Sequence, residues 1–251
     1  MDTKKYLNRI GISRGEDVSV SYEWLKTLQL AHICSVPYEN VDIIDGIPLS
    51  LDGDALYEKI VERGRGGYCF ELNSLFEKLL SSLGFKTVSY FARFWRGEEG
   101  IPHRRHRVIA VFIDEETYIA DVGIGSPSPR IPLLLREGLV QEYFGESYRF
   151  ERDAAHGWVL YELRHGEWQK YFSFTEDPQL DLDFEAISYY CEHHPSSKFN
   201  KSYIVAIKTP EGRKCVDGNT YKVFRGAEIS YIEEGMSEER RHEILKKEFG
   251  I

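Results

Sequence analysis

A glycine-rich segment that runs directly into an amphipathic helix pattern constrains this chain more than any other feature. Residues 63–73 read Arg-Gly-Arg-Gly-Gly-Tyr-Cys-Phe-Glu-Leu-Asn. Apolar residues then recur at steps of three and four, which is the period of one helix face. They are Leu72, Leu75, Phe76, Leu79, Leu80 and Leu83, and Gly84 follows as a typical helix end. The pattern predicts a buried helix that begins at Cys69.

The position of Cys69 favours a nucleophile. The first N–H groups of a helix lack intrahelical acceptors and the helix dipole is positive there, which favours the thiolate. Arg63 and Arg65 add positive charge nearby, and the glycines let a substrate approach the backbone. A buried cysteine that only fills space is the alternative. Such a residue does not need this loop, so we interpret Cys69 as functional.

Composition and charge exclude several function classes. The 251 residues are 42% hydrophobic and allow one large domain or two to three subdomains. The 32 Lys and Arg against 41 Asp and Glu give a net charge of −9, which argues against nucleic acid and anionic membranes as partners. The four cysteines form no C-x-x-C motif, and no signal-peptide core or membrane-length apolar run is present. We expect a cytoplasmic protein with free thiols.

The pattern changes twice along the chain and predicts an α+β fold of three regions, 1–84, 85–175 and 176–251. The expected helices are 3–12, one capped by Ser21 that ends near Val36, a short one carrying Leu56 and Ile60, 69–83, 184–193 and 237–249. The expected strands are 85–95, 106–113, 117–122, 148–152, 157–163, 168–174, 202–208, 214–215 and 221–224. Residues 37–40, Pro-Tyr-Glu-Asn, are expected as a loop, in the plainest interpretation a turn with an exposed glutamate.

Among the eight histidines, His106 suits the base that a cysteine nucleophile needs. It opens the apolar strand 106–113 on the same face as Val108 and Ala110, so its imidazole is expected to be half buried and rigid. Others, such as His165 in a turn and His242 on a charged helix, are expected to face solvent. A strand-edge histidine without a chemical role is the alternative interpretation of His106.

Asp121 is the candidate for the group that orients this imidazole. A carboxylate is out of place in the strand 117–122, and if buried it needs partners. If strands 106–113 and 117–122 form a hairpin, His106 and Asp121 both lie at its open end. Direct opposition would centre the turn between Ile113 and Asp114. A turn at the acidic residues 114–116 would instead need a bulge or a staggered pairing.

These residues resemble the arylamine N-acetyltransferase family. The likeness is carried by Arg65-Gly66-Gly67-Tyr68-Cys69-Phe70-Glu71-Leu72-Asn73, by His106 with its apolar strand, and by Asp121-Val122-Gly123-Ile124-Gly125. Pro37-Tyr38-Glu39-Asn40 is similar to the family's Pro-Phe-Glu-Asn element. Residues 194–199 are similar to a later family segment, in which a Thr usually stands at the place of His193. The resemblance runs over the whole chain in the expected order.

The resemblance implies a helical bundle (1–84), an antiparallel β-barrel (85–175) and an α/β lid (176–251) around a cysteine-protease-like core. It implies that Cys69 is the nucleophile, His106 the base and Asp121 the orienting residue. It also implies acetyl-CoA as donor, and aromatic amines, hydrazines or N-hydroxyarylamines as acceptors. The transfer would be ping-pong through acetyl-Cys69, with the oxyanion held by backbone N–H groups near Cys69 and Tyr68.

Two sets of contacts complete these expectations. The acceptor pocket is expected to use Tyr38, Tyr68, Phe70 and Ile124 as walls. For CoA, the candidates are Arg65, Arg104 in the basic loop 95–105, and Gly125 and Ser126, whose backbone could bind a pyrophosphate. A solvated basic loop is the alternative for residues 95–105.

Three other functions use the same residues. A thiol acyl-hydrolase or transglutaminase-like enzyme would relieve the acyl-enzyme with water or a peptide lysine. An amide synthase that closes a large polyketide would need a wide acceptor pocket. A metal-binding protein could use Cys69 or the cluster Cys191-Glu192-His193-His194, but this cluster lacks a second ligand pair. We therefore expect an enzyme without a metal.

Overall fold

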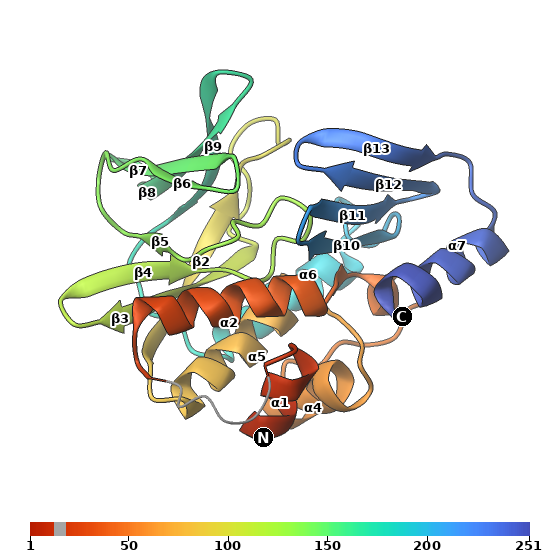
Figure 1. Ribbon diagram of the computed structural model, residues 1–251, viewed down its shortest axis with the longest axis horizontal. Helices are drawn as coiled ribbons and strands as arrows, with labels where there is room; N and C mark the ends of the chain where they lie inside the picture. Colours follow the sequence, from red (N-terminus) through yellow and green to blue (C-terminus); the bar gives the residue numbers. More distant parts are fainter. Residues whose placement is uncertain (13–18) are drawn as a thin grey trace.

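The helix α5 (Cys69–Ser82) lies in the interior of the fold and begins at the residue that the sequence predicts. The computed structural model describes residues 1–12 and 19–251 (Figure 1). The apolar face of α5 is fully buried, and Gly84 follows the helix with a positive φ of 91°, which glycine adopts without strain. The side chain of Glu71 accepts a hydrogen bond from the Tyr68 N–H (3.0 Å), which caps the first turn.

The other N-terminal helices pack around α5 in one hydrophobic cluster. They are α1 (Thr3–Arg9), α2 (Tyr22–Ser35), α3 (Val41–Ile44) and α4 (Gly53–Tyr57), which continues into the π-helical turn η1 (Glu58–Glu62). The predicted cap of α2 is confirmed, because Ser21 Oγ accepts from the Trp24 N–H. Leu25 and Leu28 of α2 are fully buried against this cluster.

An eight-stranded antiparallel sheet forms a nearly closed barrel, with strand order β5-β4-β3-β2-β9-β8-β7-β6. Its strands are β2 (Lys86–Phe94), β3 (His106–Ile113), β4 (Glu116–Ala120), β5 (Leu133–Leu134), β6 (Gln141–Tyr143), β7 (Glu146–Asp153), β8 (Gly157–Arg164) and β9 (Glu167–Phe174). The Gln141 side chain accepts a hydrogen bond from the Leu134 N–H and donates one to the Leu134 carbonyl oxygen. These bonds link the two edge strands, β6 and β5. The expected strand 117–122 ends earlier, at Ala120.

Strand β3 is buried on both faces, as its apolar run predicts. Val108 and Ala110 point into the barrel cluster, whereas Ile109, Val111 and Ile113 pack on the helical cluster with α5. The strand therefore joins the two cores, and its first residue, His106, lies next to the N-terminus of α5.

A second sheet of five antiparallel strands has the order β1-β10-β11-β12-β13. Its strands are β1 (Tyr38–Glu39), β10 (Ile204–Thr209), β11 (Gly212–Asp217), β12 (Thr220–Arg225) and β13 (Glu228–Glu233). Two predictions are corrected here. Residues 38–39 are not loop, because Tyr38 and Glu39 pair with Ala206 and Val205. Strand β13 was not predicted, because its residues are largely exposed and lack a buried face.

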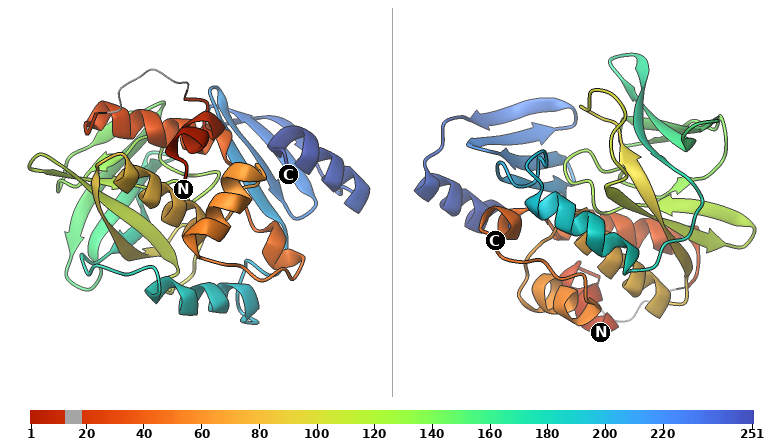
Figure 2. Two further views of the ribbon diagram at one scale, coloured as in Figure 1. Left: turned by 90° about the horizontal axis from the view of Figure 1, so that it is seen from below. Right: turned by 180° about the vertical axis from the view of Figure 1, so that it is seen from behind.

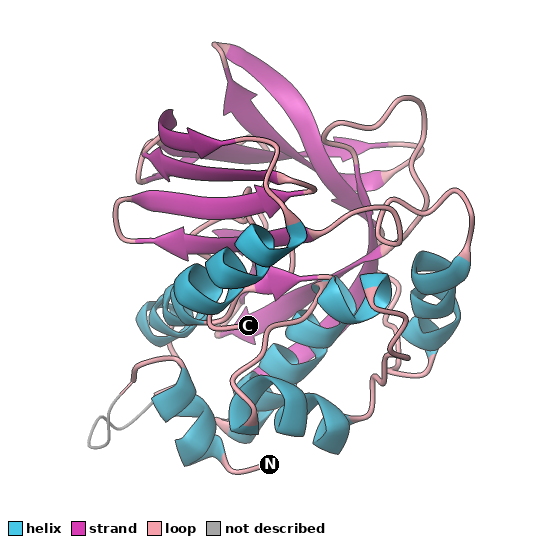
Figure 3. Ribbon diagram, turned by 90° about the vertical axis from the view of Figure 1, so that its right-hand side faces the viewer, coloured by secondary structure: helices cyan, strands magenta, loops and turns pink. Residues whose placement is uncertain are grey.

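Two C-terminal helices pack on the helical cluster and on the five-stranded sheet. Helix α6 (Asp183–His193) lies at the outer edge of the molecule (Figure 2, left), and its Phe184 and Cys191 belong to the helical cluster. Helix α7 (Glu238–Ile244) continues into η2 (Leu245–Phe249) and lies along one face of the five-stranded sheet (Figure 3). Because region 1–84 supplies β1 to the sheet of region 176–251, the regions share structure, and their boundaries as domains stay a prediction.

Candidate active site

His106 and Asp121 form a buried pair at the open end of the β3–β4 hairpin. His106 Nε2 lies 2.6 Å from Asp121 Oδ2, and both residues are almost fully buried. Ile109 pairs with Ala120 and Ile113 with Glu116, so His106 and Asp121 are not directly opposite. Asp121 reaches the imidazole diagonally from just beyond the end of β4. This is the staggered arrangement that the acidic turn residues suggest.

The second carboxylate oxygen of Asp121 is also held in place. Oδ1 accepts from Asn73 Nδ2 (2.9 Å) and from the Gly123 N–H (2.8 Å). Asn73 Oδ1 in turn accepts from the Val122 N–H (2.9 Å), and the Asp121 N–H donates to Gln29 Oε1 (3.1 Å). Because both oxygens have fixed donors, the carboxylate plane cannot rotate away from the imidazole.

Asn73 and Gln29 were not predicted as part of the site. Asn73 is four residues after Cys69 on α5, so the two side chains lie on the same face of the helix. That spacing could have identified Asn73. No local pattern marks Gln29. Its Nε2 donates to the Pro129 carbonyl oxygen, and its Oε1 accepts from the Asp121 N–H.

Cys69 is the first residue of α5 and is buried, with its Sγ 3.8 Å from the Arg105 carbonyl oxygen. Burial raises the pKa of the thiol well above its usual value, nearby Cys191 and Asp121 raise it further, and the Phe70 N–H opposes them only in part. The expectation that the helix terminus and two arginines lower this pKa is therefore wrong. Arg63 is exposed, and Arg65 is paired with carboxylates.

Arg65 belongs to a buried ion network beneath the glycine loop. Its Nη2 lies 2.8 Å from both Glu39 Oε1 and Asp42 Oδ1. Lys59 Nζ lies 2.7 Å from both Asp42 Oδ2 and Glu71 Oε1. Glu39 is only 1% exposed, so the interpretation of residues 37–40 as a turn with an exposed glutamate is wrong. The network ties β1 and η1 to the start of α5.

The close packing of this loop explains two of its features. A Cβ on Gly66 would collide with the Pro37 carbonyl oxygen, so only glycine fits at this position.

Burial raises the pKa of Glu71 to about 7 although Lys59 lowers it. Glu71 is thus a helix-capping residue whose charge changes near neutral pH.

Cys69 and His106 line one cavity of about 240 Å³. Its other lining residues are Tyr38, Phe94, Arg96, Glu98, Arg105, Gly123, Ile124, Lys198, Phe199 and Ile204. Two of the predicted acceptor walls, Tyr38 and Ile124, are present. Aromatic and aliphatic groups form part of the lining beside four charged side chains, and this apolar part suits a small aromatic ligand.

The other two predicted walls lie elsewhere. Tyr68 and Phe70 are both 0% exposed, because the first turn of α5 points them away from Cys69 into the core. The Tyr68 hydroxyl bonds Ser188 Oγ (2.6 Å), and Phe70 packs on Phe184. Phe94 and Phe199, which were not predicted, supply the aromatic walls instead.

One carboxylate at this cavity connects the barrel loop 95–105 to the segment after α6. Glu98 Oε1 accepts from Arg105 Nη2 (2.7 Å) and from Lys198 Nζ (2.9 Å). The Arg105 guanidinium also lies 5.9 Å from the centre of the Phe199 ring. The Glu98 carboxylate thus links the loop 95–105 to the segment after α6 at the cavity that Cys69 lines.

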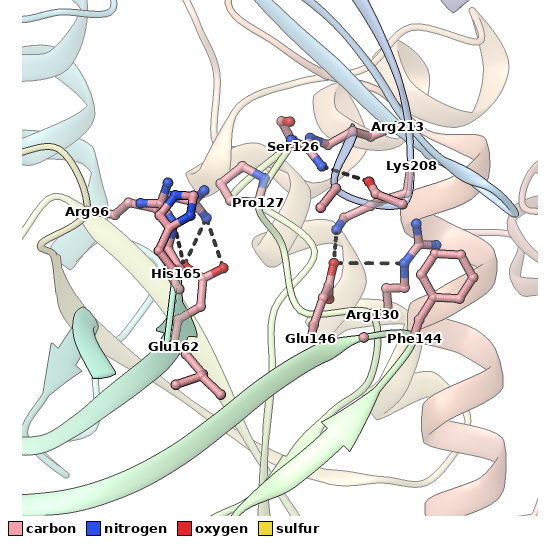
Figure 4. Close-up of a pocket in the computed structure, with 15 residues that line it drawn as sticks. Arg96, Ser126, Pro127, Arg130, Phe144, Glu146, Glu162, His165, Lys208 and Arg213 are labelled. Carbon is pink, nitrogen blue, oxygen red and sulfur yellow. Dashed lines mark hydrogen bonds and ion pairs between the residues drawn. The ribbon is translucent and has the colours of Figure 1, made fainter. Parts of the chain in front are cut away.

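The predicted CoA residues do not form one group. Arg65 is occupied by Glu39 and Asp42, and Arg104 lies exposed in the loop. Gly125 packs on Tyr38, since a Cβ would come within 2.9 Å of that ring. Ser126 lines a second cavity, which shares the lining residue Arg96 with the first (Figure 4).

Neither a metal group nor a membrane helix is found in the part of the chain that the structure describes. Across residues 1–12 and 19–251, no three His, Cys, Asp or Glu side chains gather as metal ligands. In the cluster 191–194, Cys191 is buried while His193 and His194 point outward and stack on Tyr189 and Tyr190. No helix within those ranges is both long and apolar enough to cross a bilayer.

Comparison with known proteins gives a consistent result over the whole chain. A family model described as N-acetyltransferase matches residues 21–251. The arylamine N-acetyltransferase of Mycolicibacterium smegmatis is 34% identical over 92% of this chain and 86% of its own length. That of Escherichia coli K12 is 31% identical over 98% of this chain and 87% of its own.

Solved structures agree with the sequence comparison. The arylamine N-acetyltransferase from Salmonella typhimurium superposes with a TM-score of 0.93 at 29% identity, covering 99% of this chain and 90% of its own. The Mycobacterium marinum enzyme, solved in complex with CoA, gives a TM-score of 0.91 at 30% identity, covering 100% of this chain and 93% of its own.

Proposed function

The chain belongs to the arylamine N-acetyltransferase family, and from this membership we propose that Cys69 carries the acetyl group from acetyl-CoA to an aromatic amine. The chain is an acyltransferase with acetyl-CoA as its co-substrate. The observation that carries the assignment of residues is the 2.6 Å contact of His106 with Asp121 at a cavity that Cys69 also lines.

Asp121 sets the tautomer of His106. The carboxylate accepts the hydrogen bond of Nε2–H, so Nδ1 is the unprotonated nitrogen that can take a proton. Because burial raises the pKa of the Cys69 thiol, the thiolate forms only when its proton moves to Nδ1. The imidazolium that results is stabilised by the Asp121 carboxylate. Cys69 thus becomes nucleophilic as part of a thiolate–imidazolium ion pair.

In the first half-reaction, the Cys69 thiolate attacks the carbonyl carbon of acetyl-CoA. A tetrahedral oxyanion forms and collapses, the C–S bond to CoA breaks, and the CoA thiolate takes the proton from His106. The Tyr68 N–H, one of the oxyanion donors expected from the sequence, already donates to Glu71. The Cys69 N–H at the start of α5 is the donor that fits this role.

In the second half-reaction, the amine attacks the acetyl-Cys69 thioester. His106 Nδ1 accepts the amine proton, the new C–N bond replaces the C–S bond, and Cys69 leaves as a thiolate that is reprotonated by His106. The order is ping-pong, because CoA must leave before the amine binds to the acyl-enzyme. His106 is the base in both half-reactions, whereas the nucleophile is Cys69 in the first and the amine in the second.

The acceptor cavity favours small aromatic amines. Its volume of about 240 Å³ and its walls Tyr38, Phe94, Phe199 and Ile124 suit a flat ring, whereas a polyketide amide synthase needs a wide pocket. The relative from Salmonella typhimurium is named as both an arylamine N-acetyltransferase and an N-hydroxyarylamine O-acetyltransferase. We include hydrazines, which would be acetylated on nitrogen, and N-hydroxyarylamines, which would be acetylated on the hydroxyl oxygen, among the acceptors.

The cellular setting is part of the proposal. The free thiols Cys34 and Cys215 are partly exposed, which suits a reducing compartment, so we place the protein in the cytoplasm. The net charge of −9 supports small molecules rather than nucleic acids as its partners.

Intact-mass measurement tests this function. Acetyl-CoA added without amine should give one acetyl group on the wild type, and an aromatic amine should remove it. Cys69→Ala should take up no acetyl group, whereas the control Cys215→Ala should behave like the wild type. No adduct on the wild type, or an unchanged adduct on Cys69→Ala, would refute the assignment. Loss of the adduct in water at the rate seen with amine would indicate a hydrolase.

A further inference from the structure

Part of the wall of the catalytic cavity is formed by the turn that connects α6 to β10. Residues 198–203 of this turn belong to neither a helix nor a strand. Phe199 near its start and Ile204, the first residue of β10, both line the cavity. We call residues 199–204 the wall loop. Because no helix or sheet ladder fixes the backbone of this loop, its position depends on the side chains that bond it.

Asn40 supplies three hydrogen bonds to the wall loop. Its Nδ2 donates to the carbonyl oxygens of Phe199 (2.7 Å) and Ser202 (2.8 Å), and its Oδ1 accepts from the Ile204 N–H (2.7 Å). Two carbonyl partners on one side and one N–H on the other allow a single orientation of the amide group. Asn40 is 2% exposed, so solvent does not compete for these bonds.

The Asn40 side chain serves the wall loop instead of its own helix. Asn40 occupies the N-cap position of α3, where an asparagine side chain usually caps the first turn. It makes no capping bond here, and the Val41 N–H donates to Glu39 Oε2 instead (2.8 Å). Strand β1 ends where Glu39 pairs with Val205, and the Asn40 side chain continues this ladder by one step, to Ile204.

The ring of Phe199 packs between the residue before the nucleophile and the barrel loop. Its centre lies 6.0 Å from that of the Tyr68 ring, and the Arg105 guanidinium lies 5.9 Å from it. The Phe199 backbone is held on its N–H side by Ser197 Oγ (3.2 Å) and on its carbonyl side by Asn40. A shift of this carbonyl group therefore moves the ring within the cavity that Cys69 lines.

We propose that Asn40 is a positioning residue for acceptor specificity, which holds Phe199 and Ile204 where an aromatic amine needs them to reach acetyl-Cys69. The inference rests on the proposed function, since it concerns the acceptor of that reaction. Asn40 is not one of the residues that line the cavity, so it acts through the wall loop. An acceptor without a ring makes no use of Phe199 and is indifferent to Asn40.

Deacetylation of a preformed acetyl-enzyme tests the proposal. The acetylated protein, freed of CoA, is mixed with 4-methylaniline or with hydrazine, a nucleophile that has no ring. Asn40→Asp removes both donors and places a carboxylate against two carbonyl oxygens, and Asn40→Ser removes the amide group without adding a charge. In both variants, the ratio of the second-order rate constant for 4-methylaniline to that for hydrazine should fall about tenfold.

The matched control is Asn219→Asp, in the turn between β11 and β12 of the same sheet. Its side chain bonds Arg241 on α7, and the variant should keep the wild-type ratio. A fold that is merely loosened lowers both rate constants alike. An unchanged ratio in both Asn40 variants would therefore overturn the proposal.

A double-mutant comparison shows whether the effect passes through the ring. Phe199→Leu should lower the ratio by itself. Addition of Asn40→Asp to this variant should change the ratio by less than about threefold, because the two residues act as one unit. A further fall as large as that in the wild-type background would contradict the proposal.

Failure of the proposed function and failure of this inference give different results. A wild type that forms no acetyl-enzyme would show that the proposed function is at fault. If the wild type and Asn219→Asp form the acetyl-enzyme and both Asn40 variants do not, Asn40 supports the nucleophile and the inference is wrong. Normal transfer with an unchanged ratio counts against the role of Asn40 alone.

Discussion

The Asp121 carboxylate lies 2.6 Å from His106 Nε2 although the two residues are not paired in the hairpin that carries them. Asn73, which comes from α5, makes this possible. Its amide group donates to Asp121 Oδ1 and accepts from the Val122 N–H, so it fixes the chain just beyond β4. The orientation of the imidazole therefore depends on a residue of the helix that begins with the nucleophile.

Asn73→Ala should slow acetylation more than it destabilises the fold. The carboxylate loses one of its donors, and we expect the single-turnover acetylation rate to fall about tenfold to a hundredfold. The buried Val122 N–H loses its acceptor, which costs about 1–3 kcal/mol of stability. Ser74→Ala is the matched control, because Ser74 is the next residue of α5 and its buried Oγ makes no hydrogen bond within the described chain. Equal acetylation rates in both variants would contradict the role of Asn73.

Asp121→Asn should leave the fold largely intact but remove most of the activity. An amide can donate to Nε2, which would place the proton on Nδ1 and leave no base for the thiol. By analogy with the effect of this substitution in serine-protease triads, we expect kcat to fall by about 10³–10⁴. Stopped-flow acetylation and a thermal melt check the two parts. A variant that retains normal kcat would show that Asp121 has no orienting role.

Glu71 should make stability fall as pH rises toward neutrality. Its pKa is raised from 4.5 unfolded to about 7 folded, so between these values the folded state binds more protons than the unfolded state. This contribution is fully present below pH 4.5 and is lost as the pH rises through 7. Urea unfolding at pH 5 and pH 8 measures it. Glu71→Gln should reduce the difference, whereas Glu58→Gln, an exposed glutamate on η1, should not.

Glu98→Gln should change acceptor selectivity. Lys198 is 58% exposed, so its ion pair with Glu98 contributes at most about 1 kcal/mol. Removal of the carboxylate leaves Arg105 and Lys198 unneutralised at the cavity, which favours anionic acceptors. We expect kcat/KM for 4-aminobenzoate to rise about threefold to tenfold relative to its ethyl ester. Glu99→Gln is the control, since Glu99 does not line the cavity. An unchanged ratio in Glu98→Gln would rule out this effect.

Local patterns predicted the elements that carry the site. The helix period located α5 and its first residue, and the apolar run located β3. Both patterns arise from faces that the elements bury, so they are visible in the sequence. Asp121 was identified because a carboxylate is rare in a strand, although the strand in fact ends at Ala120.

Long-range packing accounts for what the sequence did not predict. Tyr38 and Glu39 pair with β10 from the far end of the chain, which no local pattern can indicate. Tyr68 and Phe70 flank Cys69 in sequence, but the helix turns them toward the core. The pKa of Cys69 was predicted in the wrong direction, because the helix dipole is a local property whereas burial depends on the whole fold.

Kinetic competence of the acetyl-enzyme tests the central claim most directly. The acetylated protein can be freed of CoA by gel filtration and mixed with an aromatic amine in a rapid-quench instrument. We predict that the acetyl group leaves Cys69 for the amine at a rate at least equal to kcat with acetyl-CoA. An acetyl-enzyme that transfers more slowly than steady-state turnover would show that the reaction does not pass through Cys69.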